Sequence, residues 1–167
     1  MMNFDKGINA SKTQDMDKAN VVIPPPVAWA LAIALGLALD WFLPLPYIPA
    51  AVSRIWVGAA IFGAGFALSL WAILTFRKAG TRIEPHKPTT AIVAVGPYRF
   101  TRNPMYSGML LGQIGFSIGF NSLWQLAALV PFYLVLRHGV IAREEAYLER
   151  KFGAGYLGYK SGVRRWL

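Results

Sequence analysis

Long apolar runs separated by short polar stretches dominate this chain. Two runs cover residues 27–43 and about 55–76, and two shorter runs follow at about 106–120 and 123–141. Crossing the bilayer core takes about 20 apolar residues in a helix that rises about 1.5 Å per residue. The pattern therefore predicts an all-α, polytopic membrane protein with about four transmembrane helices.

Turn-forming residues separate these runs. Pro44, Pro46 and Pro49 prevent the first helix from continuing. Asn121 and Ser122 form a turn signal between the last two runs, which together indicate a C-terminal helical hairpin. The run before this turn is short for a complete span, so the sequence leaves open whether that helix crosses the whole bilayer.

The runs also divide the chain into three parts. Residues 1–26 form a polar tail, residues 27–76 hold the first two transmembrane helices, and residues 77–167 hold a polar loop, the hairpin and a charged C-terminal segment. In that segment Tyr156 and Tyr159 alternate with basic residues, which is typical of an amphipathic helix at a membrane surface. An aromatic lid over a bound nucleoside is the alternative interpretation.

The second apolar run is rich in small residues, among them Gly58, Gly63 and Gly65. Small residues let helices approach closely in lipid, where packing drives helix association. Helix packing is the favoured explanation, and close approach of a ligand to the backbone at residues 63–65 is the alternative.

Composition agrees with a membrane protein. The chain has 167 residues, of which 55% are hydrophobic and 15% are charged, against about 25% charged in soluble domains. It has no cysteine, which excludes disulfides, thiolate nucleophiles and cysteine-bound metals, and we expect no metal site. The net charge of +9 does not form a basic stripe outside the membrane flanks, so we expect no nucleic-acid partner.

The distribution of Lys and Arg predicts the orientation. With four spans, residues 1–26, 77–105 and 142–167 share one side and hold 3, 6 and 6 of the 17 basic residues. Basic loops face the cytoplasm, where the leaflet is anionic. Both termini are therefore expected to be cytoplasmic, and the polar first 20 residues predict no cleavable signal peptide.

The segment before the third helix carries candidate chemistry. Pro104 suits the first helical turn, and Asn103 is expected to cap that turn with its side-chain oxygen. Arg102 beside a helix N-terminus makes a good seat for a carboxylate. Gly108, one turn after Pro104, would keep that helix face open.

Two adjacent carboxylates, Glu144 and Glu145, follow the fourth run. Neighbouring positions on a helix point about 100° apart, so at most one of them is expected to face a given pocket. A solvated helix end that pairs with Arg143 or Arg150 is the favoured explanation from these residues alone. Charges that border a membrane helix also favour function.

Two motifs in this order resemble a known superfamily. The segment Gly-Pro-Tyr-Arg-Phe-Thr-Arg-Asn-Pro-Met-Tyr-Ser-Gly at 96–108 resembles the signature of the isoprenylcysteine carboxyl methyltransferase and phospholipid methyltransferase superfamily. Glu-Glu-Ala-Tyr-Leu at 144–148, with Phe-Gly at 152–153 and the tyrosines at 156 and 159, resembles its second signature. The likeness covers residues 77–167, which would then form the methyltransferase core.

The resemblance implies an S-adenosylmethionine-dependent methyltransferase in a bacterial inner membrane, with membrane lipids and a lipid-like methyl acceptor as partners. It also implies that ten residues line or cover the cofactor site: Tyr98, Arg102, Asn103, Pro104, Tyr106, Gly108, Glu144, Glu145, Tyr156 and Tyr159. No Rossmann fold is expected.

The acceptor stays open between two classes. The favoured acceptor is a carboxylate, as in the isoprenylcysteine enzymes, held by Arg99 or Arg102. Those enzymes usually have His where this chain has Asn103, which is closer to the phosphatidylethanolamine methyltransferases. The alternative is therefore phospholipid N-methylation, for which Glu84 or His86 would remove the amine proton. A non-catalytic membrane module and an NADPH-dependent membrane reductase are the rival classes, and the oligomeric state is open.

Overall fold

The computed structural model of the protein describes residues 19–49, 54–81 and 89–166. Within these ranges the regular structure is helical, apart from one isolated bridge between Thr101 and Arg164. The elements in chain order are α2 (Pro25–Phe42), α3 (Arg54–Lys78), the short 3-10 helix η1 (Gly96–Arg99), α4 (Pro104–Phe120), α5 (Leu123–Leu134), the π-helix η2 (Val135–Ile141), α6 (Ala142–Phe152) and α7 (Ala154–Gly162).

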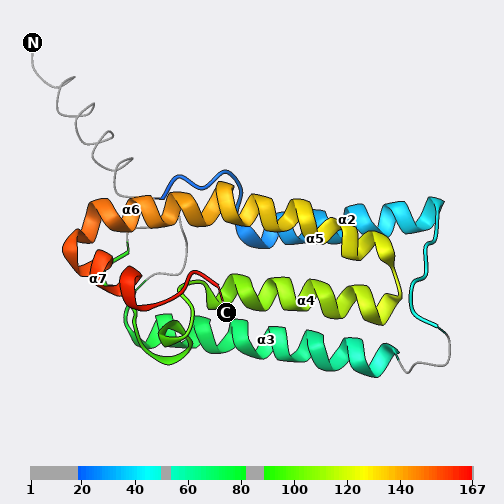
Figure 1. The fold of residues 1–167 in the computed structure, drawn as a ribbon, viewed down its shortest axis with the longest axis horizontal. Helices are drawn as coiled ribbons and strands as arrows, with labels where there is room; N and C mark the ends of the chain where they lie inside the picture. Colours follow the sequence, from blue (N-terminus) through cyan, green and yellow to red (C-terminus); the bar gives the residue numbers. More distant parts are fainter. Residues whose placement is uncertain (1–18, 50–53, 82–88, 167) are drawn as a thin grey trace, which may run out of the picture.

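The long helices are α2, α3, α4 and the continuous helix Leu123–Phe152, which includes α5. They form an elongated bundle, in which α3 lies beside α4 and α2 lies beside α5 (Figure 1). Among the described residues, α2, α3 and the continuous helix Leu123–Phe152 are each long and apolar enough to cross a membrane. Helix α4 is shorter, with 17 residues. The prediction of an all-α membrane protein with about four membrane helices is confirmed.

Glycines bring α3 and α4 into backbone contact. A Cβ atom added to Gly65 would lie 2.5 Å from the carbonyl oxygen of Gly108 and 2.7 Å from the amide nitrogen of Gly112. Gly58 meets the backbone at Gly115 in the same way, whereas a Cβ on Gly63 would meet open space. Gly58 and Gly65 therefore serve helix packing, as small residues do in lipid.

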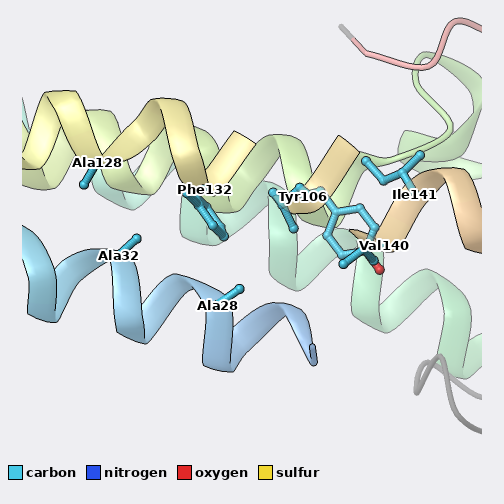
Figure 2. Packing of buried hydrophobic residues seen from close by; sticks show 8 residues of the cluster. Ala28, Ala32, Tyr106, Ala128, Phe132, Val140 and Ile141 are labelled. Atoms are coloured by element: carbon cyan, nitrogen blue, oxygen red, sulfur yellow. The ribbon is translucent and has the colours of Figure 1, made fainter. Parts of the chain in front are cut away.

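A second contact joins α2 to the hairpin. Ala28 and Ala32 of α2 face Ala128 and Phe132 of α5 in the close-up of the buried cluster (Figure 2). Phe132 is 2% exposed. The small alanine side chains let α2 approach α5 closely enough to bury this ring.

Amide side chains connect the same helices inside the bundle. Trp29 Nε1 donates to Gln113 Oε1 at 3.0 Å, and Gln113 Nε2 donates to Gln125 Oε1 at 2.9 Å. Gln125 Nε2 in turn donates to the carbonyl of Ile33 at 2.9 Å. Because lipid offers no hydrogen bonds, these buried amides are satisfied by α2, α4 and α5 themselves.

The predicted hairpin turn is confirmed. Asn121 adopts the left-handed conformation, with φ 53° and ψ 46°, and ends α4. Its Oδ1 accepts hydrogen bonds from the amides of Tyr47 (3.1 Å) and Ile48 (2.8 Å), which lie in the loop after α2. The turn therefore also holds that loop at this end of the bundle.

The fourth helix is longer than the apolar run predicted. It continues from Leu123 through the π-helical segment η2 into α6 and ends at Phe152. The prediction that Glu144 and Glu145 mark a helix end is therefore wrong, because both lie within a continuous helix. The π-helical segment begins shortly after Pro131, which lies inside α5 and has no amide hydrogen to donate.

Candidate active site

The segment before α4 and the chain after α7 are joined by hydrogen bonds at one end of the bundle. The amide of Arg102 donates to the carbonyl of Arg164 at 2.8 Å. The carbonyl of Arg165 accepts from Thr101 Oγ1 at 3.0 Å and from Asn103 Nδ2 at 2.9 Å. We call this connection between residues 101–103 and 163–165 the tail clamp.

Arg102 supplies the centre of the tail clamp. Its Nη1 donates to the carbonyls of Lys160, at 2.9 Å, and Val163. Its Nη2 donates to Glu145 Oε1 at 3.0 Å. The seat for a carboxylate that the sequence predicted beside this helix N-terminus is thus filled by the protein's own Glu145.

Glu145 is a buried carboxylate that pairs with three cations. Its side chain is 7% exposed, and Arg165 donates to it through Nε, at 3.1 Å, and through Nη2. The hydrogen bond with Glu145 raises the pKa of Arg165 above its ordinary value. The predicted pairing with Arg143 or Arg150 is wrong, since Arg143 instead donates to the carbonyl of Asn20 at 2.9 Å.

Asn103 occupies the N-cap position of α4, but its side chain makes no capping hydrogen bond. The expectation that its oxygen caps the helix is wrong, because its Nδ2 is oriented to the carbonyl of Arg165. The tail clamp competes for this side chain, and Asn103 therefore links the helix start to the tail.

A cavity of about 830 Å³, including its open mouth, borders the tail clamp at Arg102 and Asn103. Of the ten residues that the resemblance implied for a cofactor site, nine line it: Tyr98, Arg102, Asn103, Pro104, Tyr106, Glu144, Glu145, Tyr156 and Tyr159. We call it the polar cavity. Whether these residues bind a cofactor stays a prediction.

One expectation about this cavity is wrong, and one residue that the resemblance implied for the cofactor site lies elsewhere. Glu144 and Glu145 both line it, although they were expected to face different directions. The cavity extends around this part of α6, with α4 on the Glu144 side and the tail clamp on the Glu145 side. Gly108 does not line it, because Gly108 packs against Gly65 and Ser69 of α3.

Glu144 has a different environment from Glu145. Tyr106 Oη donates to Glu144 Oε1 at 2.8 Å, and among the described residues this is the hydrogen bond that Glu144 accepts. Tyr106 is buried, with 7% of its surface exposed. Glu144 therefore has a neutral partner, whereas Glu145 has three cationic ones, Arg102, Arg165 and, at 4.0 Å, Lys160.

Two buried donors in the polar cavity have no partner within the described parts of the chain. They are Tyr98 Oη and Arg102 Nε. Tyr98 is 4% exposed, and Tyr159 Oη donates to its carbonyl at 2.8 Å. Burial raises the pKa of Tyr98 well above its ordinary value and raises the pKa of Tyr159 to about 12. Both phenols are therefore protonated donors at neutral pH.

A second hollow, of about 1110 Å³ including its open side, is lined by apolar side chains of α2, α3 and α4. Its lining residues are Pro24, Pro25, Pro26, Trp29, Phe62, Phe66, Ser69, Ile73, Met105, Tyr106, Gly108, Met109 and Gly112. We call it the apolar groove. Met105 and Tyr106 line both the groove and the polar cavity, so the two spaces adjoin at these residues.

Sequence reasoning missed the groove. Phe62, Phe66, Ser69 and Ile73 follow one face of α3 at helical spacing. Spacing alone does not tell which face of a membrane helix borders a cavity and which borders lipid, because both are apolar.

Three residues that were predicted to act on the acceptor do not line the polar cavity or the apolar groove within the described parts of the chain. Glu84 and His86 lie outside the described residues. Arg99, a predicted carboxylate holder, is exposed and does not line the polar cavity. Among the described residues, Arg102 is thus the cation that lines the cavity, and it shares its carboxylate partner, Glu145, with Arg165.

Two comparisons with known proteins bear on the family of this chain. An uncharacterized protein of Haemophilus influenzae is 47% identical over 63 residues, which are 38% of this chain and the full length of that protein. The family model for phospholipid methyltransferases matches residues 53–155, more than half of the chain, from the start of α3 to the start of α7. The protein belongs to the phospholipid methyltransferase family.

Proposed function

We propose that the protein is an S-adenosylmethionine-dependent methyltransferase that methylates the amine of a membrane lipid. The observation that carries the proposal is the meeting of a polar cavity and a lipid-accessible groove at Met105 and Tyr106. Membership of the family supports methyl transfer. The cofactor and the acceptor class are our inference from the residues that line the two spaces.

The polar cavity fits the cofactor chemically. When bound, S-adenosylmethionine supplies an electrophilic methyl group on a sulfonium. Its amino-acid carboxylate requires donors, and the unpaired Tyr98 Oη and Arg102 Nε supply two. Its adenine requires aromatic or apolar walls, which Tyr156 and Tyr159 provide.

The apolar groove suits the hydrocarbon of the acceptor. Phe66 is 62% exposed on the outer surface of α3, where lipid surrounds the bundle. An acceptor that diffuses in the bilayer can therefore place its tail in the groove without crossing water, while its head reaches Tyr106. Positioning of this kind supplies much of the rate of a displacement reaction.

The charges of the polar cavity support an amine rather than a carboxylate acceptor. The one described cation that lines it, Arg102, already pairs with Glu145 at 3.0 Å. Glu144 adds a carboxylate that no described cation neutralises. A carboxylate acceptor would face this charge, whereas an ammonium head would be attracted to it.

The product of the reaction tests the proposal. The protein in nanodiscs is incubated with methyl-labelled S-adenosylmethionine and a total lipid extract, and the labelled lipid is treated with alkali. We expect a non-volatile label, because an N-methyl bond survives alkali. Release of volatile labelled methanol would identify a methyl ester and overturn the amine assignment in favour of the carboxylate.

Cofactor binding is tested with Tyr98→Phe. Loss of one hydrogen bond of about 1 kcal/mol should weaken S-adenosylmethionine roughly fivefold in calorimetry. Tyr133→Phe is the matched control, since Tyr133 lies on α5 and does not line the polar cavity. Binding of NADPH instead of S-adenosylmethionine would indicate a reductase, and binding of neither would indicate a non-catalytic membrane protein.

A further inference from the structure

We infer that residues 19–23 form a strap that gates the exchange of a water-soluble ligand between the polar cavity and solvent. We call this segment the N-terminal strap. The inference rests on the function proposed above and deepens it, because it states how the cofactor enters and leaves the polar cavity. The strap precedes residues 53–155, which the family model matches, so membership of the family does not imply it.

The N-terminal strap lies between the two ligand spaces. Ala19, its first residue, lines the polar cavity and is 5% exposed. The residues that follow the strap, Pro24, Pro25 and Pro26, line the apolar groove. Figure 1 shows this part of the chain, in blue, running along the fourth helix before α2 begins. The strap is therefore a wall of the polar cavity that does not belong to a helix.

Within the described residues, two hydrogen bonds join the strap to the fourth helix. The amide of Val22 donates to the carbonyl of Gly139, in η2, at 3.0 Å. Arg143 Nη1, in α6, donates to the carbonyl of Asn20 at 2.9 Å. Val22, Asn20 and Arg143 are all exposed. Because water can replace an exposed hydrogen bond, these two bonds add little net stability to the closed strap.

The two ends of the strap are held unequally. Val21 and Ile23 pack against the buried cluster that contains Phe132. The other end is held to the helix by the hydrogen bond between Arg143 and the carbonyl of Asn20. Asn20 also has a φ of 44°, a left-handed conformation that costs free energy in residues other than glycine. Opening relieves that cost, so it should begin at the cavity end while the rest of the strap stays anchored.

The other walls are less suited to admit a charged cofactor. The tail clamp contains the ion pair of Arg102 with Glu145, whose side chains are 9% and 7% exposed. Val93, on a further wall, is 6% exposed and packs in a second buried cluster with Ala72 and Tyr98. The apolar groove excludes a zwitterion, because removing its charges from water is costly. The weakly held strap is therefore the wall that opens most easily, as gating segments commonly do.

The structure offers a reversible lock for this strap. A Cβ atom added to Gly139 would lie 3.5 Å from the Cβ atom of Val22. Disulfides join Cβ atoms that lie roughly 3.5–4.5 Å apart. Because the chain has no cysteine, the pair Val22→Cys and Gly139→Cys can form only this one intramolecular bond. The same protein can then be compared with the strap fixed, after oxidation, and free, after reduction.

The lock tests gating through the rates of ligand exchange. The reduced double variant in nanodiscs is loaded with labelled S-adenosylmethionine, one half is oxidised, and both halves are chased with unlabelled ligand. Release should be at least tenfold slower from the oxidised half, and a reductant should restore the faster rate. Association with the empty oxidised protein should be slower by the same factor, so the Kd should change less than threefold.

Two controls accompany the lock. The single variants Val22→Cys and Gly139→Cys, treated with the same oxidant, should exchange the ligand as fast as wild type. Equal rates for the oxidised and reduced double variant would overturn the gate. Failure of the disulfide to form would contradict the contact of Val22 with Gly139, and with it the strap.

Release of the strap is tested without any cofactor. Ala19→Cys is nearly isosteric and places a thiol at a buried position, so a small water-soluble maleimide should label it slowly. Arg143→Met removes the hydrogen bond to Asn20 and should speed this labelling about fivefold. Arg150→Met is the matched control, because Arg150 is also exposed on α6 but lies outside the described hydrogen bonds of the strap. Equal labelling in the Arg143 and Arg150 variants would refute release at this point.

The outcomes separate the two proposals. If wild type binds no S-adenosylmethionine, the proposed function fails, while labelling of Ala19→Cys still shows whether the strap opens. If S-adenosylmethionine binds but the lock does not change its exchange rates, the inference fails and the methyltransferase proposal stands. If the lock changes the Kd and leaves the release rate unchanged, the strap supplies binding contacts and the gate is wrong.

Discussion

Replacing Arg102 should destabilise the C-terminal segment directly, and should affect ligand binding only as a consequence. Arg102→Met keeps the apolar stem but removes three hydrogen bonds, those to Glu145, Lys160 and Val163. All three have the charged guanidinium as donor, and a hydrogen bond to a charged group contributes about 1.5–3 kcal/mol. Because such contributions do not simply add, we take the roughly 3–5 kcal/mol lost when a buried ion pair loses one partner as the expected loss.

Hydrogen exchange measures this loss locally. Backbone amides of residues 156–166 should exchange at least 100-fold faster in Arg102→Met, because about 3 kcal/mol of lost opening free energy changes the exchange rate by more than two decades. Amides of α3 should be unchanged. Arg99→Met is the control, since Arg99 is exposed and lies outside the tail clamp.

A double-mutant cycle with Glu145→Gln identifies the pair that is responsible. The coupling free energy between Arg102 and Glu145 should be about 1.5–3 kcal/mol. Slow exchange at residues 156–166 in Arg102→Met, or coupling below about 0.5 kcal/mol, would refute the tail clamp as the element that holds this end of the cavity. If the tail clamp is loosened as expected, Arg102 variants should also bind the proposed cofactor more weakly.

Two further predictions concern packing and orientation. Gly58→Ala should lower the free energy of unfolding by roughly 1–3 kcal/mol, because the added methyl group clashes with the backbone of α4. Gly63→Ala should change it by less than about 0.5 kcal/mol. Equal effects would contradict the close contact of α3 with α4. Because the chain has no cysteine, Ser161→Cys and Leu43→Cys can each be labelled in intact cells with a membrane-impermeant maleimide. We expect labelling at Leu43→Cys only, since the tail clamp end is predicted to be cytoplasmic, and labelling at Ser161→Cys would reverse the orientation.

The helices could be predicted because the bilayer limits what the sequence can form. An apolar run in lipid must form a helix, because its backbone groups have no other hydrogen-bond partners. The helices begin and end close to the signals in the sequence, which are the ends of the apolar runs, the proline-rich loop at 44–49 and the turn at Asn121. The same reasoning failed at residue 141, where the apolar run ends and the helix continues. Beyond the apolar run, α6 is stabilised by contacts of Glu145 with the tail clamp. The length of the apolar run cannot predict these contacts.

Partners of polar side chains were harder to predict. Asn103 is a good N-cap residue, and only the position of the Arg165 carbonyl explains why its side chain turns away. Gly108 was implied for the cofactor site, but it packs on Gly65 and lines the apolar groove rather than the polar cavity. Both placements have one physical cause: a helix position specifies a direction, and the tertiary packing specifies what lies there.

The chain of amides between α4, α5 and α2 has a consequence for membrane insertion. Gln113 Nε2 donates to Gln125 Oε1 and to the backbone carbonyl of Gln125, so the hairpin enters the hydrocarbon with half of the polar groups of these two side chains already satisfied and can insert as a unit. The groups that this hairpin leaves open are filled by Trp29 and by the carbonyl of Ile33. α2 is thereby recognised by two polar contacts at a defined depth, so the same chain of bonds that satisfies the amides also sets the register in which the first helix docks.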